Sequence, residues 1–480
     1  MIEPLRYCMP SLLAGALALV APCAAVAQGR PDWAKVEEET MRHFQALVRL
    51  DTSNPPGNET RAAEYVQRVL EAEGIPVERL ALDPARANVV ARLKGNGSKR
   101  PLLLLGHTDV VTVEPSKWTF PPFSATRDAG WVYGRGTLDD KDNLTGSLMM
   151  MLLLKRLNVP LDRDVVFMAE SGEEGTTRFG VDYMVENHFA KIDAEFCLAE
   201  GGGITRVDGM PRVANVGVLE KVPRTIELVA RGPAGHASIP LRNNAVAHLS
   251  AGVAAVAAWD PPVKLNEVTR EYFRRLATIS PAEEAQRMRD VLSDDPGRVQ
   301  AAVDWFEENA PSYASLVRTS ASPTIISGGN RVNVIPSEVQ ATIDVRILPD
   351  EDPEALLDRV RQVVNDPAVE VRFPRREGMP RPPGGTSIST VAFQAIEAAI
   401  TKHYNVLTLP SMSTGATDGA QLRAKGINCY GIGPASDRED GPKGFGAHSD
   451  QERILESELH RFVRFYWDLV TTIAGKPSTN

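Results

Sequence analysis

The stretch LLLLGHTD at residues 102–109 decides the fold of this chain. Four bulky apolar residues that lead into a glycine and a polar loop are typical of a strand buried on both faces of a parallel sheet. The same pattern recurs in VVFMAESGEE at 165–174 and in FCLAEGGG at 196–203. Because side chains that follow such strands meet at one edge of the sheet, we expect a His, an Asp and several Glu to gather there. Buried acids need cations as partners, so this edge predicts a metal site.

The whole chain has the composition of a globular protein with room for two domains. It has 480 residues, of which 43% are apolar and 24% are charged. Its net charge is -9 at pH 7 and it contains no basic stripe, which argues against a nucleic-acid partner. Cys197 and Cys429 lie in apolar, strand-like stretches, so we expect them to be buried thiols.

The first 27 residues have the pattern of a secretory signal peptide. Arg6 precedes an apolar stretch at 11–20, and AVA at 25–27 is a cleavage site that predicts a mature protein beginning at Gln28. A retained membrane anchor is the alternative interpretation of this segment. Later apolar runs are too short to span a bilayer. We therefore expect an exported protein, periplasmic or secreted, with no stable membrane anchor after the signal is removed.

The expected elements divide the mature chain into three parts. Strands and helices alternate over residues 28–220, which is typical of a parallel sheet covered by helices. From residue 221 the strands alternate polar and apolar residues, which indicates a smaller α+β unit over 221–377. The first pattern resumes over 378–480. The sequence therefore predicts an α/β domain in two parts with an inserted α+β domain, preceded by the signal peptide at 1–27.

Zinc takes histidine nitrogen and carboxylate oxygen as ligands, and a catalytic site keeps one position open for water. Two adjacent metal ions also need a bridging carboxylate. Glu173 is a further carboxylate at the same edge that could act as a general base. The candidate metal ligands are His107, Asp139, Glu174, Glu200 and His448.

Nine short motifs occur in a fixed order along the chain, and together they are highly specific. With them the chain resembles the dinuclear zinc exopeptidase and amidohydrolase family, which includes aminoacylases, carnosinase-like dipeptidases, glutamate carboxypeptidase and desuccinylases. The resemblance covers essentially the whole mature chain. The motifs are GHTDVV (106–111), GRGTLDDKD (134–142), GEEG (172–175), EGGG (200–203), GHASIP (235–240), NVIP (333–336), DVR (344–346), GATDG (415–419) and AHSDQERI (447–454).

The resemblance implies a role for each candidate ligand. It implies that His107 and Glu200 bind the first metal, that Glu174 and His448 bind the second, and that Asp139 bridges both. It further implies that Asp109 orients His107, that Glu173 is the general base, and that the Asp139–Asp140 peptide bond is cis. The implied cofactor is two divalent ions, with zinc expected and cobalt or manganese as alternatives.

The resemblance also implies substrate contacts. His236, in the inserted domain, matches a residue that polarises the scissile carbonyl, often from the partner subunit. Asn333 and Arg346 match residues that hold the substrate carboxylate, which suits the planar guanidinium of arginine. Gly415 and Thr417 match a loop of the family that contacts the substrate backbone. The implied architecture is a zinc-exopeptidase catalytic domain with an inserted lid or dimerisation domain, through which a homodimer would form.

Two positions are of special interest, one that departs from the family pattern and one that differs among family members. Asp142 stands where the family usually has Gly, and we expect it near the start of a helix, where it could act as an N-cap. Position 200 is Glu, as in aminoacylase-like and desuccinylase-like members, which favours N-acyl substrates.

We therefore expect a metal-dependent hydrolase that cleaves an amide or peptide bond in a small carboxylate-bearing substrate, with Glu173 deprotonating metal-activated water. An N-acyl amino acid and a short peptide are both suitable substrates, so a dipeptidase or carboxypeptidase competes with an N-acyl amidohydrolase. A non-catalytic protein of the same fold, which binds peptide or metal, is disfavoured because the base and all five ligands are present.

Overall fold

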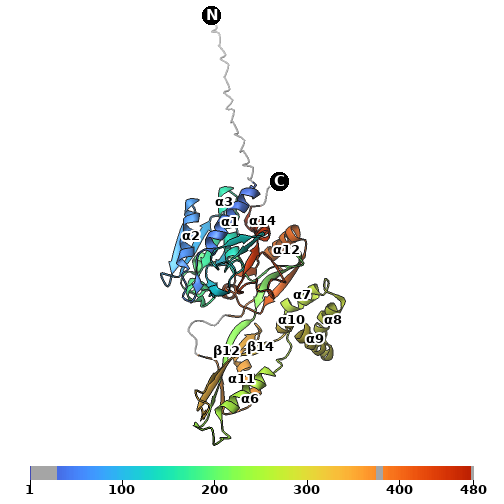
Figure 1. Ribbon diagram of the computed structural model, residues 1–480. Coiled ribbons are helices and arrows are strands. Elements are labelled where there is room, and N and C mark those ends of the chain that lie inside the picture. The colour runs from blue at the N-terminus through green and yellow to red at the C-terminus, as the bar shows by residue number, and fades with distance from the viewer. Residues whose placement is uncertain (2–29, 375–381, 477–480) are drawn as a thin grey trace.

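A mixed sheet of ten strands is the centre of the larger domain (Figure 1). The computed structural model describes residue 1, residues 30–374 and residues 382–476, so all of the predicted signal peptide except Met1 lies outside the described residues. The strand order is β2-β3-β8-β4-β9-β19-β11-β10-β20, with β18 paired to β11. The strands are β2 (Val77–Ala81), β3 (Ala87–Leu93), β4 (Leu102–His107), β8 (Val165–Glu170), β9 (Phe196–Ala199), β10 (Gly203–Val207), β11 (Met210–Glu220), β18 (Leu407–Ser413), β19 (Asn428–Gly431) and β20 (Ala435–Asp437).

The three strands predicted from their apolar runs form the middle of this sheet. β4 pairs in parallel with β8 on one side and β9 on the other, and every residue of the three strands is buried. Successive side chains of a strand point to opposite faces. Leu102 and Leu104 therefore join the apolar core on one face, and Leu103 and Leu105 join the core on the other. This double burial explains why the sequence shows continuous apolar runs here rather than alternation.

Helices cover both faces of the sheet, as the alternating pattern predicts. The core on one face includes side chains from α2, α3, α12 and α14, and the core on the other includes side chains from α4, α5 and α13. Cys197 and Cys429 face each other in the β9–β19 register as buried free thiols, which confirms the expectation for them. The helices are α1 (Trp33–Val48), α2 (Thr60–Ala72), α3 (Lys141–Arg156), α4 (Val181–Asn187), α5 (Phe189–Ile192), α12 (Val391–Tyr404), α13 (Gly419–Ala424) and α14 (Glu456–Ala474).

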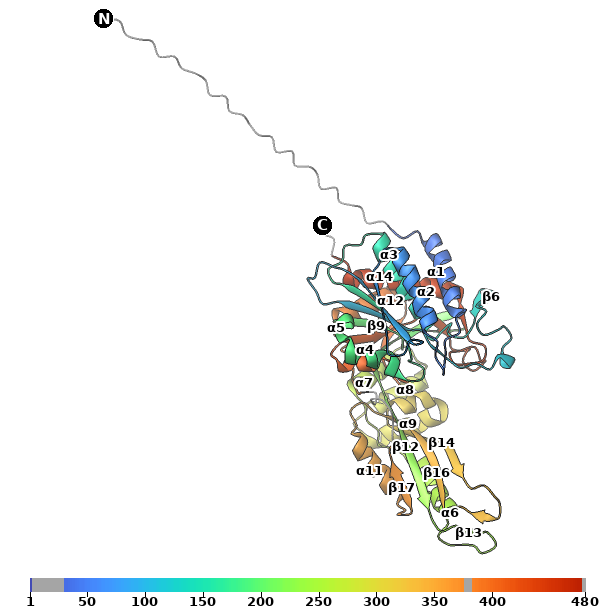
Figure 2. The ribbon, with the colours of Figure 1, turned by 90° about the vertical axis from the view of Figure 1, so that its left-hand side faces the viewer.

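A second, smaller sheet forms the lower domain in Figure 1, within the predicted insertion. Its four strands are antiparallel in the order β14-β16-β12-β17, and they share an apolar core with α6 and α11. A two-stranded ribbon of β13 and β15 lies at its far end (Figure 2). The elements are β12 (Val222–Arg231), β13 (Gly235–His236), α6 (Ala245–Ala257), β14 (Ser320–Gly328), β15 (Val334–Ile335), β16 (Glu338–Ile347), α11 (Pro353–Val364) and β17 (Val369–Arg372).

Four helices inside the predicted insertion pack on the larger domain instead of on the small sheet. Phe273 and Phe306 belong to the same apolar core as the large sheet. Arg275 anchors the first of these helices, because it donates to the backbone oxygen of Thr408 in β18 (2.9 Å) and pairs with Glu397 in α12 (2.6 Å). The domain boundaries at 220/221 and 377/378 stay a prediction. The helices are α7 (Glu267–Leu276), α8 (Ala282–Val291), α9 (Pro296–Asn309) and α10 (Pro311–Leu316).

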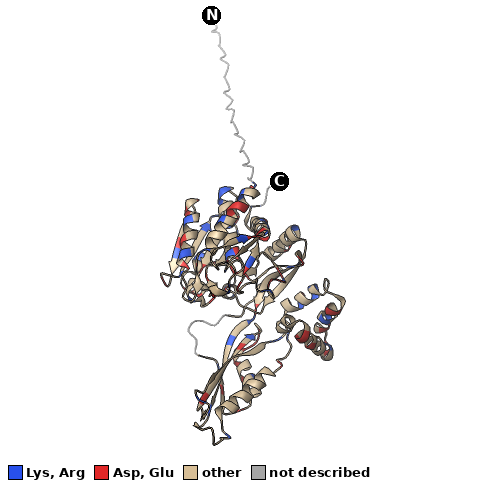
Figure 3. Cartoon of the chain, viewed as in Figure 1, with Lys and Arg blue, Asp and Glu red and all other residues tan. Residues whose placement is uncertain are grey.

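Short strands and turns complete the described residues. Two small sheets lie beside the large one: β1 with β5, and β6 with β7 and β21. No helix in the described ranges is long and apolar enough to cross a bilayer. Basic and acidic residues are interspersed along the ribbon in Figure 3. The remaining elements are β1 (Ser53–Asn54), β5 (Val110–Val111), β6 (Thr126–Asp128), β7 (Trp131–Tyr133) and β21 (Arg453–Leu455), with 3-10 turns at Pro115–Lys117 and Thr177–Phe179.

Candidate metal centre

His107 is the last residue of β4, so the strand carries its imidazole to the edge of the large sheet. Nδ1 lies 3.0 Å from the backbone oxygen of Asp109, and Nε2 lies 2.9 Å from Oδ1 of Asp139. A proton on Nδ1 that is donated to the Asp109 carbonyl leaves the lone pair of Nε2 for a metal. Burial disfavours the charged imidazole, yet hydrogen bonds to Asp109 and Asp139 raise the pKa of His107 well above its usual value.

Asp139 lies between the two histidines of the predicted ligand set. Its Oδ1 is 2.9 Å from Nε2 of His107, and its Oδ2 is 3.0 Å from Nε2 of His448. The Asp139–Asp140 peptide bond is cis, as the resemblance implies. A carboxylate with one oxygen toward each imidazole has the arrangement that a bridging ligand requires.

Glu174 and His448 meet on the other side of Asp139. Nε2 of His448 lies 3.0 Å from Oε1 of Glu174, although 274 residues separate them. Hydrogen bonds to Asp139 and Glu174 raise the pKa of His448 to about 10. The negative charges of these two carboxylates therefore stabilise the protonated form of the His448 imidazole.

The clustered donor atoms fit divalent cations. His107, Asp139 and Glu174 each offer a ligand atom within 4.8 Å of the others, and so do His107, Glu173 and Glu200. Burial, with the charge of Asp139 adding to it, raises the pKa of Glu200 well above its usual value. Four carboxylates therefore face two imidazoles, and metal ions would offset this excess of negative charge.

Asp109 connects His107 to the loop that carries Glu173 and Glu174. Its carboxylate is fully buried and accepts the backbone N–H groups of Glu173 and Glu174, each at 3.1 Å. Oδ1 also lies 3.4 Å from Nδ1 of His107. The side chain expected to orient one histidine thus also fixes the backbone of the predicted base and its neighbouring ligand.

Asn54 is a buried residue of this centre that the sequence did not point to. Its Nδ2 donates to Oδ2 of Asp109 over 2.8 Å. The same side chain packs against Gly175, where a Cβ would lie 2.7 Å from Nδ2 of Asn54. This close approach accounts for the glycine that ends the GEEG motif.

Glu452 is a second residue without a predicted role. Its fully buried carboxylate accepts the N–H groups of Gly136 (3.2 Å) and Leu138 (2.7 Å) and pairs with Arg135 (2.6 Å). The last motif of the sequence therefore supports the loop that carries Asp139. Sequence spacing gives no sign of this link, because 314 residues separate Leu138 from Glu452.

Asp142 does not act as an N-cap, which corrects the expectation for it. The helix α3 begins at Lys141 and its N-cap position is Asp140, so Asp142 lies inside the first turn. Its carboxyl is buried and its Oδ1 accepts the N–H of Asn143 over 2.9 Å. The helix starts two residues earlier than an Asp142 cap requires.

The substrate residues implied by the resemblance lie in two places. His236 and Asn333 are neighbours in the exposed β13–β15 region, where the N–H of Ala237 donates to the backbone oxygen of Asn333 (3.0 Å). This region lies at the end of the small domain away from the large sheet (Figure 2). His236 accepts or donates a hydrogen bond with Oγ of Ser238 at 2.7 Å. The structure therefore does not bring these two residues to the metal centre of their own chain.

The other implied residues lie near the junction of the two domains. Arg346, on β16, pairs with Asp344 at 2.7 Å. The N–H of Gly415 donates to Oγ of Ser413 at 3.0 Å. Thr417 is buried, and its N–H and hydroxyl donate to Glu220 at 2.8 and 2.6 Å, so this hydroxyl holds the loop to the end of β11.

Comparison with known proteins gives consistent matches. Residues 103–472 match the model of Peptidase family M20/M25/M40. A probable carboxypeptidase S-like 2 from Dictyostelium discoideum is 28% identical over 80% of this chain and 74% of its own length. Human N-fatty-acyl-amino acid synthase/hydrolase PM20D1 is 25% identical over 78% and 74%, and a probable succinyl-diaminopimelate desuccinylase from Staphylococcus aureus is 28% identical over 69% and 72%.

Solved structures share the fold. The metallo-carboxypeptidase Sso-CP2 from Sulfolobus solfataricus has a TM-score of 0.65 and 19% identity, covering 90% of this chain and 98% of its own. Human carnosine dipeptidase 1 has a TM-score of 0.63 and 13% identity, covering 92% and 99%. The family match spans most of the chain and includes the clustered His and carboxylate side chains. The chain therefore belongs to Peptidase family M20/M25/M40 and is a hydrolase of carbon–nitrogen bonds.

Proposed function

We propose that this protein is a two-metal amidohydrolase that releases an amino acid from a small carboxylate-bearing substrate, either an N-acyl amino acid or a short peptide. The observation that carries the proposal is the position of Asp139 between His107 and His448, with Glu173 beside them. Zinc is the proposed metal because it suits histidine and carboxylate ligands, and cobalt and manganese are the alternatives.

The side chains of the centre divide the chemistry among them. Bound divalent metals would polarise the scissile carbonyl and acidify a water molecule. Glu173 accepts the proton of the attacking water and returns it to the leaving amine. Asp109 holds the backbone of Glu173 in place through one hydrogen bond. His236 is the proposed donor to the developing oxyanion, and Asn333 and Arg346 are the proposed partners of the substrate carboxylate.

The relatives support both candidate substrate classes. One is named a carboxypeptidase, and another an N-fatty-acyl-amino acid synthase/hydrolase. The alternative function is therefore a dipeptidase or carboxypeptidase with the same centre. We also propose, from the sequence of residues 1–27 alone, that the protein is exported.

The test is amine release by the zinc-loaded protein from a panel of N-acyl amino acids and dipeptides. Glu173→Gln should bind the same amount of zinc and turn over about 10²–10⁴ times more slowly. Glu186→Gln, an exposed exchange of the same kind, is the matched control. Wild-type turnover in zinc-loaded Glu173→Gln would refute the proposed base. Absence of turnover on every substrate would instead favour a binding protein.

We further propose a homodimer that forms through the small domain. β14 is an edge strand of the small sheet, and Ile325 and Ile326 on it are 59% and 65% exposed. Unpaired edges with apolar side chains favour pairing with another chain. The exposed His236 lies in the same domain, so a dimer offers a way to carry it to the centre of the partner subunit.

Mixed dimers test this arrangement. Glu173→Gln and His236→Ala are each expected to be nearly inactive alone. If His236 acts on the partner's centre, a 1:1 mixture of the two should regain about a quarter of wild-type activity, because half of the dimers then hold one intact site of two. Ile326→Lys should sediment as a monomer and fail to complement. A mixture that stays inactive, with heterodimers demonstrated, would contradict the proposal.

A further inference from the structure

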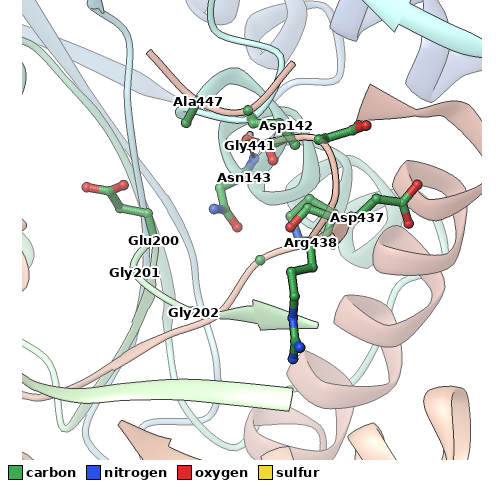
Figure 4. Close-up of a pocket in the computed structure, with 15 residues that line it drawn as sticks. Asp142, Asn143, Glu200, Gly201, Gly202, Asp437, Arg438, Gly441 and Ala447 are labelled. Atoms are coloured by element: carbon green, nitrogen blue, oxygen red, sulfur yellow. Dashed lines mark hydrogen bonds between the residues drawn. The ribbon is translucent and has the colours of Figure 1, made fainter. Parts of the chain in front are cut away.

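A cavity of about 320 Å³ opens beside the metal centre (Figure 4). Glu200, a proposed ligand, forms part of its wall. Leu138 and Ala447, which precede Asp139 and His448 in the chain, form another part. The volume lies at the lower end of the range for small-molecule sites. A small group held in this cavity would therefore lie next to a bond placed at the metals.

The wall of the cavity belongs to the larger domain. All the described residues that line it fall within 138–202 and 433–447, whereas Asn333 and Arg346, the proposed partners of the substrate carboxylate, belong to the smaller domain. A substrate whose scissile carbonyl lies at the metals extends from it in two directions, toward the amino acid with its carboxylate and toward the acyl group. With the carboxylate held by the smaller domain, the acyl group is the part that this cavity can receive.

The acidic residues of the wall leave no carboxylate for a positively charged group. Asp437 pairs with Arg206 at 3.4 Å, and Asp440 accepts two hydrogen bonds from Arg453. Asp142 is only 1% exposed, and burial raises the pKa of its carboxyl well above its usual value. The remaining acid of the wall is the proposed metal ligand. Among the described lining residues, a substrate ammonium would therefore find no acceptor of opposite charge, and its desolvation would go uncompensated.

The rest of the wall is built from small or uncharged residues. Arg438, the one basic residue among those described, is exposed and runs away from Glu200 in Figure 4. Aliphatic groups need no hydrogen-bond partner and gain free energy on leaving water, so a wall of this kind suits them. The uncharged wall consists of five glycines with Leu138, Pro434, Ala447, Asn143 and Ser436.

We propose that this cavity is the acyl subsite and that it takes an uncharged aliphatic acyl group of a few carbon atoms. The inference rests on the proposed function and chooses between its two substrate classes. An N-acyl amino acid places only an alkyl chain against the wall. A dipeptide would instead bring an α-ammonium to a wall that has no carboxylate to receive it.

Gly441 offers a way to narrow the cavity without straining the chain. It lies on the wall, a Cβ placed on it would meet no heavy atom within 4 Å, and its φ lies outside the left-handed region. A larger side chain therefore fits at Gly441 and can take up space beside the acyl group. Ser436, exposed on β20, is a second wall position that can be enlarged.

Three substrates test the subsite: the N-hexanoyl, N-acetyl and norleucyl derivatives of the amino acid that the amine-release panel favours. The norleucyl group is the hexanoyl group with an α-ammonium added. Zinc-loaded wild-type protein should hydrolyse the hexanoyl compound with a kcat/KM at least about tenfold higher than either of the others, since each buried methylene contributes about fourfold.

Two enlarged variants test the wall. Gly441→Leu and Ser436→Leu should each lower the hexanoyl-to-acetyl ratio of kcat/KM by at least about fivefold, which is the effect of excluding one or two methylenes, and Gly441→Ala should lower it less. Ala72→Leu, an exposed enlargement at the end of α2, is the matched control and should keep the ratio.

The outcomes separate this inference from the proposed function. Equal or faster hydrolysis of the norleucyl compound would overturn the acyl subsite and leave amide hydrolysis in place. A hexanoyl-to-acetyl ratio near one in the wild type, or a high ratio that both leucine variants retain, would overturn it as well. Circular dichroism and zinc content check the fold of each variant, and the wild-type comparison does not depend on them. No hydrolysis of any amide would refute the proposed function, and the subsite with it.

Discussion

Replacing Asn54 by alanine tests whether the buried network around Asp109 holds the metal centre together. Asn54 donates one hydrogen bond of 2.8 Å to Asp109, which also accepts the N–H groups of Glu173 and Glu174. Burial opposes ionisation of Asp109, but hydrogen bonds from His107 and Asn54 still lower the pKa of its carboxyl. The lost bond therefore goes to a charged, fully buried acceptor, and such bonds contribute about 1.5–3 kcal/mol each.

In chelator-treated protein, Asn54→Ala should therefore lower the free energy of unfolding by about 1.5–3 kcal/mol. Zinc affinity should fall about 10–100-fold. This is the usual effect of removing a group that orients the metal ligands by hydrogen bonding without binding the metal itself. Urea unfolding with chelator present measures the first quantity, and competition with a zinc-binding dye measures the second.

Asn58→Ala, in the same loop, is the matched control, since the described contacts give its side chain no bond to the centre. Asn54→Asp should be more harmful than Asn54→Ala, because it places a second carboxylate 2.8 Å from Asp109. Wild-type zinc affinity and stability in both Asn54 variants would refute the reasoning.

A pH series on His448 follows from its pKa, which Asp139 and Glu174 raise to about 10 from 6.5 in the metal-free chain. Because the folded pKa is raised, these ion pairs stabilise the metal-free fold fully below pH 6.5, and the gain is lost as the pH rises through about 10. Zinc must displace the same proton, so its affinity should rise across this window, and calorimetry in buffers of different ionisation enthalpy should detect proton release. Substitution of His448 by Asn should flatten both dependences, and unchanged profiles would contradict this assignment.

The large sheet and most of the centre could be predicted because their physical cause is local. A strand buried on both faces must be apolar throughout, so residues 102–105, 165–169 and 196–199 were recognisable, and they lie in β4, β8 and β9. Strands in parallel order then place the residues that follow them at one edge. His107 and Glu200 therefore lie in one site because each stands at the end of a buried strand, and the sequence shows both strands as apolar runs.

Other features could not be predicted because their partners are distant in the chain. Glu452 and Asn54 look like ordinary polar residues until folding brings them to Leu138 and Asp109. The helices over 267–316 have apolar faces, but periodicity does not say which core receives them, and they join that of the large domain.

The position of His236 gives a physical reason to favour action between subunits. β12 runs for ten residues from the domain junction, and at about 3.3 Å per residue it spans about 30 Å. His236 lies five residues beyond its end. The base of this strand is fixed, because the N–H of Lys221 donates to Ser413 (2.9 Å) and Glu220 pairs with Arg423 (2.7 Å). Bringing His236 to its own centre would require the sheet to fold back across this anchored junction. A second copy docked along β14 requires no such rearrangement, so complementation between variants is the outcome that this geometry favours.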